Sequence, residues 1–461
     1  MTATDEQIAE TAERSPVRSL RERLDRRFPR AGTMLILGVL IVILNGLHVH
    51  SYSVISPFDE NFHIDRLIRS SRFEFVQPDD QTSQESLDEV ACRGTDDVAP
   101  WPPCTKGRYD PKEFSYKGWN AASGNPPYYY VATGVTARVL RALPGPHSIV
   151  TWGRILGSLW LLIGVYFVVR VAEYFSVRRL PLVLGVLLVV ASPSLLHASN
   201  TINTDASAFA AGAAVLLAGL AWERSRAPLW LLAVTAAACA SLDNTNALGV
   251  AIVLFYFLVR GVTSRREPGE PKHVRPWRDY LVAGVVAAAS AVLAVLAWRG
   301  VYLVFAHHVD LRNAPQIKIF HVDSLDLEMV LGKDTLFGVF PPLNGYVPPV
   351  LGTTAYQLFA QAAVLLTVGL LIAAFLRARL SDRLASLGLA TTAALIVTPA
   401  MFVIYNFVFG SLYFHILPRN ALAALPAIAI VAAAVPRTRV GVAMLGIVAV
   451  GLYGSAAIAL L

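Results

Sequence analysis

The residues best suited to chemistry lie just after the first apolar segment, between positions 56 and 69. Pro57 is suited to start a helix, which puts Asp59 and Glu60 in a first turn where the helix dipole favours anions. At 3.6 residues per turn, Asp59, His63 and Arg66 then share one face. The pattern predicts a carboxylate, an imidazole and a guanidinium side by side. The alternative is structural: helix-start acids, with arginines that anchor the helix at a membrane interface.

Further polar residues lie at the ends of apolar segments, on one side of the membrane by the topology derived below. They are Asn125, Tyr128, Asn203, Asp205, Lys333, His415 and Arg419. Polar residues at one depth on a single face indicate a shared cavity. Asp205 also has an alternative role, because an aspartate at a helix start commonly caps the helix.

The composition defines the environment of these residues. Hydrophobic residues make up 55% of the 461 positions, charged residues only 15%, and the mean hydropathy is +0.52. Soluble domains carry about 25% charged residues. The chain is therefore a polytopic membrane protein, which excludes a cytosolic enzyme, a nucleic-acid binder and a secreted disulfide scaffold. The net charge of +7 lies in short clusters between apolar runs, so it reports topology rather than a nucleic-acid partner.

The basic clusters set the orientation, because the positive-inside rule places them in the cytoplasm. This holds only if Pro126–Leu143 does not cross the membrane. Two prolines at its start and two internal arginines favour a helix lying in the interface. The other apolar runs predict eleven transmembrane helices, near 33–50, 150–172, 181–198, 205–222, 227–242, 247–260, 280–305, 356–376, 384–407, 417–435 and 439–460.

The predicted fold is thus an all-α polytopic membrane protein. Residues 1–32 form a basic cytoplasmic segment, and residues 33–460 form the transmembrane domain. Two long loops, 51–149 and 306–355, face outward, and the first carries two interfacial helices. Chemistry is disproportionately placed on such loops. The polar turn 243–246 separates two short segments and is expected to dip below the outer surface.

Two of the three cysteines, Cys92 and Cys104, lie in the first outward loop. An outward loop is in an oxidising space, so we predict a Cys92–Cys104 disulfide. Two free thiols are the alternative, and a zinc site is disfavoured because no other Cys or His lies nearby at zinc spacing. Cys239 lies in an apolar helix and is predicted to be a packing residue.

The order of these motifs resembles the GT-C superfamily of integral-membrane glycosyltransferases, which use polyprenyl-phosphate sugars as donors. Within it, the chain looks closest to an uncharacterised bacterial branch of predicted membrane proteins. The resemblance covers nearly the whole chain, but Pro418-Arg419-Asn420 stands where that branch has Gly-Arg-Tyr. The matching features are Pro57-Phe58-Asp59-Glu60 with His63, Asn125-Pro126-Pro127-Tyr128, and Arg154 entering the second span.

The resemblance implies inverting sugar transfer on the outer face of a bacterial plasma membrane. Asp59 would be the general base, with Glu60 and His63 orienting it or binding sugar hydroxyls. Arg419, then Lys333 and Arg66, would hold the donor phosphate. The sugar would be bound by Asn203, Asp205, Asn125, Tyr128 and His415.

The implied partners are a polyprenyl-phosphate sugar, a glycan or glycolipid acceptor of the cell envelope, and membrane lipid. We expect no cofactor and no metal; the disfavoured alternative is a divalent cation on Asp59, Glu60 and Asp205. Ala-, Val- and Arg-rich usage makes decaprenyl-phosphoryl arabinose, and so arabinofuranosyl transfer, one candidate beside undecaprenyl-phosphate hexoses.

Two other classes of protein remain as alternatives. A transporter or flippase of lipid-linked sugars would tend to carry repeats and buried ionisable residues inside its helices, which this sequence does not show clearly. A receptor or scaffold with a disulfide-bearing outer loop would not account for the acidic pair or for the polar helix ends.

Overall fold

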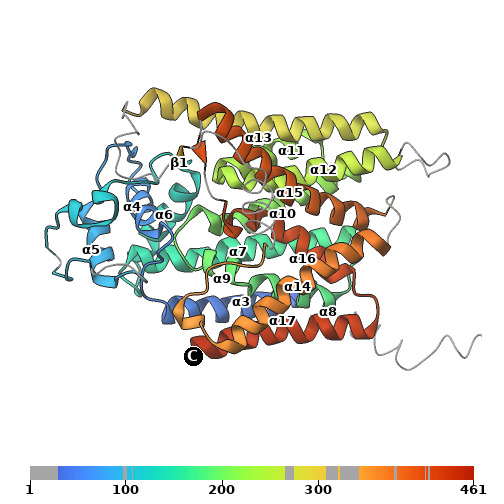
Figure 1. Cartoon of the computed structure of the whole chain (residues 1–461), viewed down its shortest axis with the longest axis horizontal. Helices are drawn as coiled ribbons and strands as arrows, with labels where there is room; N and C mark the ends of the chain where they lie inside the picture. Colours follow the sequence, from blue (N-terminus) through green and yellow to red (C-terminus); the bar gives the residue numbers. More distant parts are fainter. Residues whose placement is uncertain are drawn as a thin grey trace, which may run out of the picture.

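The computed structural model describes residues 30–96, 101–105, 107–264, 275–307, 320–321, 342–377, 382–410, 412–413 and 416–461. Within these ranges the chain is a bundle of apolar helices with a lobe of short helices at one end (Figure 1). Strand structure there is limited to β1 (Phe320–His321) and β2 (Leu412–Tyr413), which pair antiparallel.

In the part of the chain that the structure describes, eleven apolar helical segments match the eleven predicted spans, so the prediction of an all-α polytopic membrane fold is confirmed. Large apolar side chains such as Val304, Leu365 and Ile447 stay exposed on the bundle, as expected of surfaces that face lipid. Among the described residues, eight segments are long and apolar enough to cross a membrane: α3 (Arg30–Ser51), α7 (Ile149–Tyr174), α10 (Ala208–Glu223) together with the 3-10 helix that precedes it from Thr204, α12 (Ala247–Ser264), α13 (Trp277–Phe305), α14 (Thr354–Arg377), α15 (Arg383–Gly410) and α17 (Arg439–Leu460). Three are shorter: α8 (Arg179–Val190), α11 (Leu229–Leu242) and α16 (Leu425–Ala434), which continues the 3-10 helix η7 (Pro418–Ala424).

The third predicted span, 181–198, is not one helix. α8 ends at Val190, and a separate short helix, α9 (Pro193–Ala198), begins at Pro193. Proline has no N–H to continue the helix, and its ring pushes Ser192 into the extended conformation that the structure shows. The chain then turns into the 3-10 helix η3 (Thr204–Ser207), which leads into α10. This break brings a polar stretch to the end of the bundle beside the lobe.

The lobe is formed by the chain between α3 and α7. It contains α4 (Glu60–Ser70), α5 (Gln84–Arg93), α6 (Tyr128–Arg141), and the 3-10 helices η1 (Pro111–Glu113) and η2 (Ser115–Gly118). A hydrophobic core of its own includes Ile64, Leu67 and Val90. α6 packs against α4 and α7 and is not among the helices able to cross a membrane. A helix is thus present in this segment, and its place in the membrane interface stays a prediction. α5 was not predicted, and α4 begins at Glu60 rather than at Pro57.

The basic clusters lie together at the other end of the bundle. Arg178, Arg260, Arg383 and Arg437 come from separate connections and helix ends, yet they line one cavity. Arg275 lies over an indole ring at the end of α10, 4.3 Å from its centroid. The prediction of eleven transmembrane helices assumes that all basic clusters lie on the same side of the membrane, and these arginines do lie at the same end of the bundle.

Close packing fixes η7 against α10. A Cβ atom at Gly212 would lie only 2.1 Å from the carbonyl oxygen of Ala423. Glycine is therefore required at this approach, as at many contacts between membrane helices. The contact matters for the site because η7 carries Arg419.

Candidate active site

Asp59 immediately precedes α4 and has a left-handed backbone, with φ 64° and ψ 3°. Aspartate tolerates this conformation better than most residues, but it remains unfavourable for a residue with a Cβ. Its carbonyl oxygen accepts from the amides of Phe62 and His63, at 3.0 and 3.2 Å, which holds the turn in place. Its carboxylate does not cap the helix and is 46% exposed. The turn thus presents the carboxylate outside α4.

Arg419 contacts Asp59 from the far end of the sequence. Its Nη2 donates to Asp59 Oδ2 at 2.9 Å, and its Nε lies 3.9 Å from Asp205 Oδ2. The guanidinium carbon also lies over the ring of Phe58, 5.8 Å from the centroid. One guanidinium therefore lies between two carboxylates. All three residues lie at helix ends that the sequence predicts on the same side of the membrane.

A cavity of about 290 Å³ opens at this end of the bundle. That volume is near the lower bound of roughly 300 Å³ for small-molecule sites. The ring of Tyr346 packs edge-on against Phe58 and His197, with centroids 4.8 and 5.0 Å apart. The cavity is lined by Phe58, Ser194, His197, Ala198, Asn203, Asp205, Asn344, Gly345, Tyr346, Leu417, Pro418 and Arg419.

Glu60 is fully buried and has no capacity left for a substrate. Its carboxylate accepts from Arg154 Nε and Nη2, at 3.0 and 2.7 Å, and from the amides of Ser56 and Ile202, at 2.7 and 2.8 Å. Arg154 in turn donates to the carbonyl oxygens of Tyr52 and Val54, each at 2.7 Å. Of the two predicted roles, binding sugar hydroxyls is wrong for this geometry, because four donors already occupy the two carboxylate oxygens. The role that remains is to hold the turn that carries Asp59.

His63 is held by a tyrosine. Its Nδ1 lies 2.6 Å from the hydroxyl of Tyr130, which also accepts from Asn125 Nδ2 at 2.9 Å. The hydroxyl proton therefore goes to His63 Nδ1, and we infer a neutral imidazole with its own proton on Nε2. Burial lowers the pKa of His63 to about 4; Arg419 also lowers it, against the opposing effect of Asp59. The imidazole is thus a neutral donor at physiological pH.

Arg66 shares a face of α4 with His63, as predicted, but Asp59 lies outside the helix. The Arg66 side chain is only 1% exposed; its Nη2 donates to the carbonyl oxygen of Asn125 at 3.1 Å. Burial lowers its pKa. Nε and Nη1 have no hydrogen-bond partner among the residues described. Arg66, Asn125 and Tyr128 do not line the 290 Å³ cavity, and Tyr128 is exposed at the start of α6.

Asn203 caps a helix, whereas Asp205, for which capping was the alternative role, does not. The side chain of Asn203 accepts from the amide of Ala206 at 3.1 Å and donates to Thr201 Oγ1 at 2.7 Å, so Asn203 caps η3. One N–H and one lone pair of this amide stay free, and Asn203 lines the cavity, so sugar binding by Asn203 stays a prediction. Asp205 does not cap the helix, and its carboxylate faces Arg419 and the cavity.

Sequence reasoning missed one carboxylate, that of Asp243. It follows α11 and caps the 3-10 helix η4 (Asn244–Asn246), accepting from the amide and the hydroxyl of Thr245, each at 2.7 Å. It also accepts from the hydroxyl of Thr204, which ties η4 to η3. The sequence does predict a polar turn at 243–246 that dips below the outer surface, but it does not predict the contact between Asp243 and Thr204 of η3.

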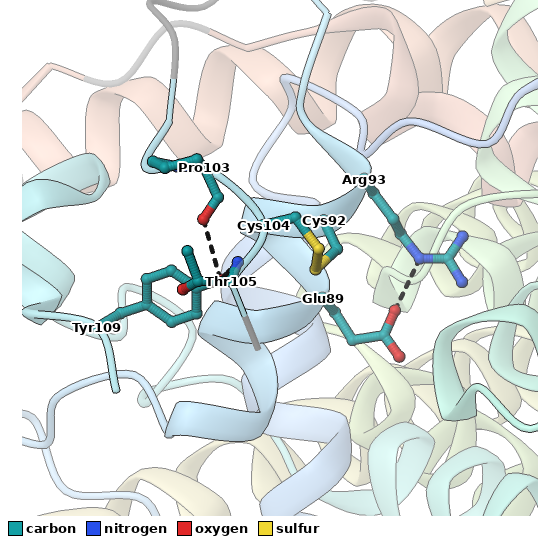
Figure 2. Close-up of a disulfide and its surroundings, with 7 residues drawn as sticks. All are labelled: Glu89, Cys92, Arg93, Pro103, Cys104, Thr105 and Tyr109. Carbon is teal, nitrogen blue, oxygen red and sulfur yellow. Dashed lines mark hydrogen bonds and ion pairs between the residues drawn. A yellow bond between two sulfur atoms is a disulfide. The ribbon is translucent and has the colours of Figure 1, made fainter. Parts of the chain in front are cut away.

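The predicted disulfide is present between Cys92 and Cys104 (Figure 2). It joins the last turn of α5 to the segment 101–105, beside the Arg93–Glu89 ion pair at 2.7 Å. Tyr109 packs near it and donates to the carbonyl oxygen of Pro103 at 3.2 Å. The disulfide fastens the outer edge of the lobe and does not reach the cavity. Cys239 is buried, in keeping with its predicted packing role.

Two predicted site residues, Lys333 and His415, lie outside the described residues. Within the described ranges, no three His, Cys, Asp or Glu side chains come together in a way that could hold a metal ion. Of the three oxygen ligands considered from the sequence, Glu60 is already bound to Arg154. The absence of a cofactor stays a prediction.

Comparison with known proteins gives a likeness in structure alone. No protein-family model and no curated protein matches the chain. The chain is similar to ArnT from Cupriavidus metallidurans in the apo state, with a TM-score of 0.45 and 14% identity, over 88% of this chain and 59% of that chain. For ArnT bound to undecaprenyl phosphate, the TM-score is 0.43 and the identity 15%, over 88% and 60%. The chain thus spans about 60% of the length of these proteins. At these scores the likeness assigns it no ligand and no residue role.

Proposed function

We propose that the chain is a membrane glycosyltransferase that transfers a sugar from a polyprenyl-phosphate donor to a glycan or glycolipid of the cell envelope. The observation that carries the proposal is the Asp59–Arg419 pair beside the cavity, with Asp205 as the second carboxylate. Transfer of a sugar from a phosphate leaving group requires a base for the acceptor proton and a cation for the phosphate charge. The partly exposed carboxylate and the guanidinium supply these two groups, and the cavity gives space for the sugar.

The reaction starts when the donor phosphate takes Arg419 from Asp59. While Arg419 Nη2 donates to Asp59 Oδ2, that oxygen is occupied. A phosphate is the better partner, because guanidinium groups bind phosphate oxygens in a bidentate manner. Donor binding therefore releases Asp59 Oδ2, and without its counter-ion the carboxylate becomes a stronger base.

In the transfer step, Asp59 accepts the proton of the acceptor hydroxyl as that oxygen bonds to the anomeric carbon from the face opposite the phosphate. The bond between the anomeric carbon and the phosphate oxygen breaks, and its electron pair stays on the phosphate, where Arg419 holds the charge. Attack from the opposite face inverts the anomeric centre. Asp205 is placed to accept hydrogen bonds from sugar hydroxyls. Glu60 and His63 position the turn rather than react.

The lipid environment supports a polyprenyl donor. The bundle exposes large apolar side chains along its helices, while the cavity lies at the helix ends. A polyprenyl chain can then lie along the bundle as its phosphate reaches Arg419. We place the site on the extracytoplasmic face of a bacterial plasma membrane, because the arginine clusters at the other end mark the cytoplasmic side. Undecaprenyl hexoses and decaprenyl arabinose remain the two candidate donors.

The proposal is tested in a strain that lacks this gene, by analysing the sugars and linkages of its envelope. The missing linkage should return when the wild-type chain is induced. Asp59→Asn should restore it about 10²- to 10⁴-fold more slowly, the usual loss on removing a general base. Glu113→Gln, which alters an exposed carboxylate of the same lobe, is the matched control and should behave as wild type. All chains must reach equal levels in the membrane.

Full-rate restoration by Asp59→Asn would show that Asp59 is not the base and would favour a transporter of lipid-linked sugars. An unchanged envelope in the deletion strain would contradict both readings. The missing linkage itself identifies the donor sugar and the acceptor.

A further inference from the structure

A second, larger cavity lies at the other end of the bundle. Its volume is about 600 Å³, and it opens where α7 and α16 end and where α8 and α15 begin. α10 separates the two cavities: Asp205 lies just before it and Glu223 is its last residue. Its 16 residues span roughly 24 Å. The proposed transfer reaction makes no use of this second cavity.

Four guanidinium groups converge on this cavity from four separate segments. Arg178 precedes α8, Arg260 lies on α12, Arg383 begins α15, and Arg437 follows α16. The one carboxylate in the lining, Asp382, caps α15 by accepting from the amide of Leu384 at 3.0 Å. The positive-inside rule accounts for arginines anywhere in these connections. It does not require them to surround a hollow.

Glu223 holds two of these arginines in place from behind. It is 3% exposed and accepts from Arg260 Nε at 3.1 Å, and Arg383 Nε lies 3.4 Å from its other oxygen. The hydroxyls of Tyr256 and Tyr280 also donate to it, at 2.9 and 3.0 Å. One carboxylate thus contacts two guanidinium groups, and its single negative charge balances only one of their two positive charges. Such a fixed arrangement is typical of a built anion site, because the arginines are ordered before any ligand arrives.

Positive charge remains in excess around the cavity. Arg224 lies next to it and donates to the carbonyl oxygen of Tyr174 at 2.6 Å. Its Nε is buried without a hydrogen-bond partner in the part of the chain that the structure describes. Burial, and then the nearby Arg383, lower the pKa of Arg224. An anion in the cavity would relieve this repulsion.

We propose that this cavity binds a phosphate group, with the headgroup of an anionic membrane phospholipid as the ligand. Arginine side chains match phosphate oxygens in charge and in bidentate geometry. The cavity lies at the ends of membrane-spanning helices, where headgroups are concentrated, and basic pockets between such helices bind anionic headgroups. Free phosphate has the same chemistry, so the experiment separates the two sources.

The test uses the full-length chain, purified and stripped of lipid, in a neutral detergent. Native mass spectrometry and melting temperature are measured with phosphatidylglycerol, with phosphatidylcholine and with inorganic phosphate. We expect phosphatidylglycerol to be retained and to raise the melting temperature more than phosphatidylcholine does. The variant Arg178→Gln/Arg437→Gln changes two exposed residues of the cavity rim and should weaken this binding about tenfold or more.

The matched control is Arg278→Gln/Arg439→Gln, which removes the same charge from exposed residues at the same end but outside the cavity lining. It should retain phosphatidylglycerol as the wild type does. Phosphate binding that is lost in the rim variant, without lipid binding, would support the site and assign it to free phosphate. Equal loss in both variants, or no preference for phosphatidylglycerol or phosphate over phosphatidylcholine, would overturn the proposal.

Discussion

At the scale of single residues, the site is organised by competition for one guanidinium. Arg419 donates to Asp59 and lies 3.9 Å from Asp205, so the guanidinium partly neutralises two carboxylates, of which only that of Asp59 is substantially exposed. The left-handed backbone of Asp59 adds a local cost that the hydrogen bonds of its carbonyl oxygen offset. These contacts hold Arg419 in place without substrate, and an anion that binds guanidinium better than a carboxylate does, such as a phosphate, can displace Asp59 from it.

The protonation of His63 leads to a prediction about pH. Its pKa is about 4 in the folded chain, below the ordinary value of 6.5. The unfolded chain therefore binds the proton more readily, so the stabilising contribution is complete above pH 6.5 and is lost as the pH falls toward 4. The loss amounts to roughly 3 kcal/mol. Melting temperatures of wild type and His63→Gln should diverge at pH 7 and converge toward pH 4.5, and parallel curves would contradict the assignment.

The role of a residue was predictable only where the sequence indicates whether its side chain is exposed or buried. Asp59 and Arg419 were predicted as site residues because polar residues at several helix ends lie on one side of the membrane and because the motifs resemble those of the GT-C superfamily. Glu60 was predicted to be catalytic because it adjoins Asp59 in a motif, and a motif does not reveal which of two neighbours points inward. The burial of Glu60 depends on Arg154, which is 94 residues away in the sequence. Only the fold brings the two together.

At the scale of elements, the Glu60–Arg154 ion pair ties α4 to α7 and to the turn before η3. Both side chains are almost fully buried, at 0% and 1% exposed. Glu60→Gln leaves the guanidinium without its counter-ion and should lower the free energy of unfolding by about 3 to 5 kcal/mol. The control is Glu85→Gln, which removes the surface ion pairs with Arg72 and Arg141 and should cost about 1 kcal/mol or less for each pair. Equal shifts in melting temperature would contradict a structural role for Glu60.

The contact between α10 and η7 gives a second prediction at this scale. Gly212→Ala places a methyl group 2.1 Å from the Ala423 carbonyl oxygen, so η7 must move and Arg419 must move with it. We expect a loss of about 1 to 3 kcal/mol in stability and a loss of activity in the envelope assay. Gly46→Ala is the control, because nothing lies within 4 Å of its added methyl group. Unchanged activity in Gly212→Ala would show that the packing of η7 against α10 does not set the position of Arg419 in the site.

Elements were predictable where hydrophobicity alone determines them. Long apolar runs gave helices whose bounds differ from the predicted ones by a few residues at most ends. α5 was not predicted because its ten residues mix charges and apolar side chains and depend on the core of the lobe. The break at Pro193 does not show in the hydropathy, because the apolar run continues through it. Proline nevertheless ends α8 there, since it has no N–H to continue the helix.

At the scale of the whole molecule, the two ends of the bundle differ in charge. The end with the lobe carries the disulfide and a cavity whose lining holds one carboxylate, Asp205, and one guanidinium, Arg419, whereas the cavity at the other end is lined by four arginines. This polarity was predictable from the positive-inside rule, since only one assignment of the segment 126–143 puts all basic clusters on one side. The position of each cavity was not predictable, because cavities arise where helices of unequal length fail to meet.

The orientation of this polarity in the membrane can be measured by labelling. Glu113→Cys places a thiol on the exposed surface of the lobe, and Arg439→Cys places one at the exposed start of α17, at the other end. A membrane-impermeant maleimide should label Glu113→Cys in intact cells, and Arg439→Cys only after the membrane is opened. The unsubstituted chain should stay unlabelled, because two of its cysteines form the disulfide and Cys239 is buried. The opposite pattern would put Asp59 and Arg419 in the cytoplasm, where they would face cytoplasmic acceptors, and would overturn transfer to the envelope from the outer face.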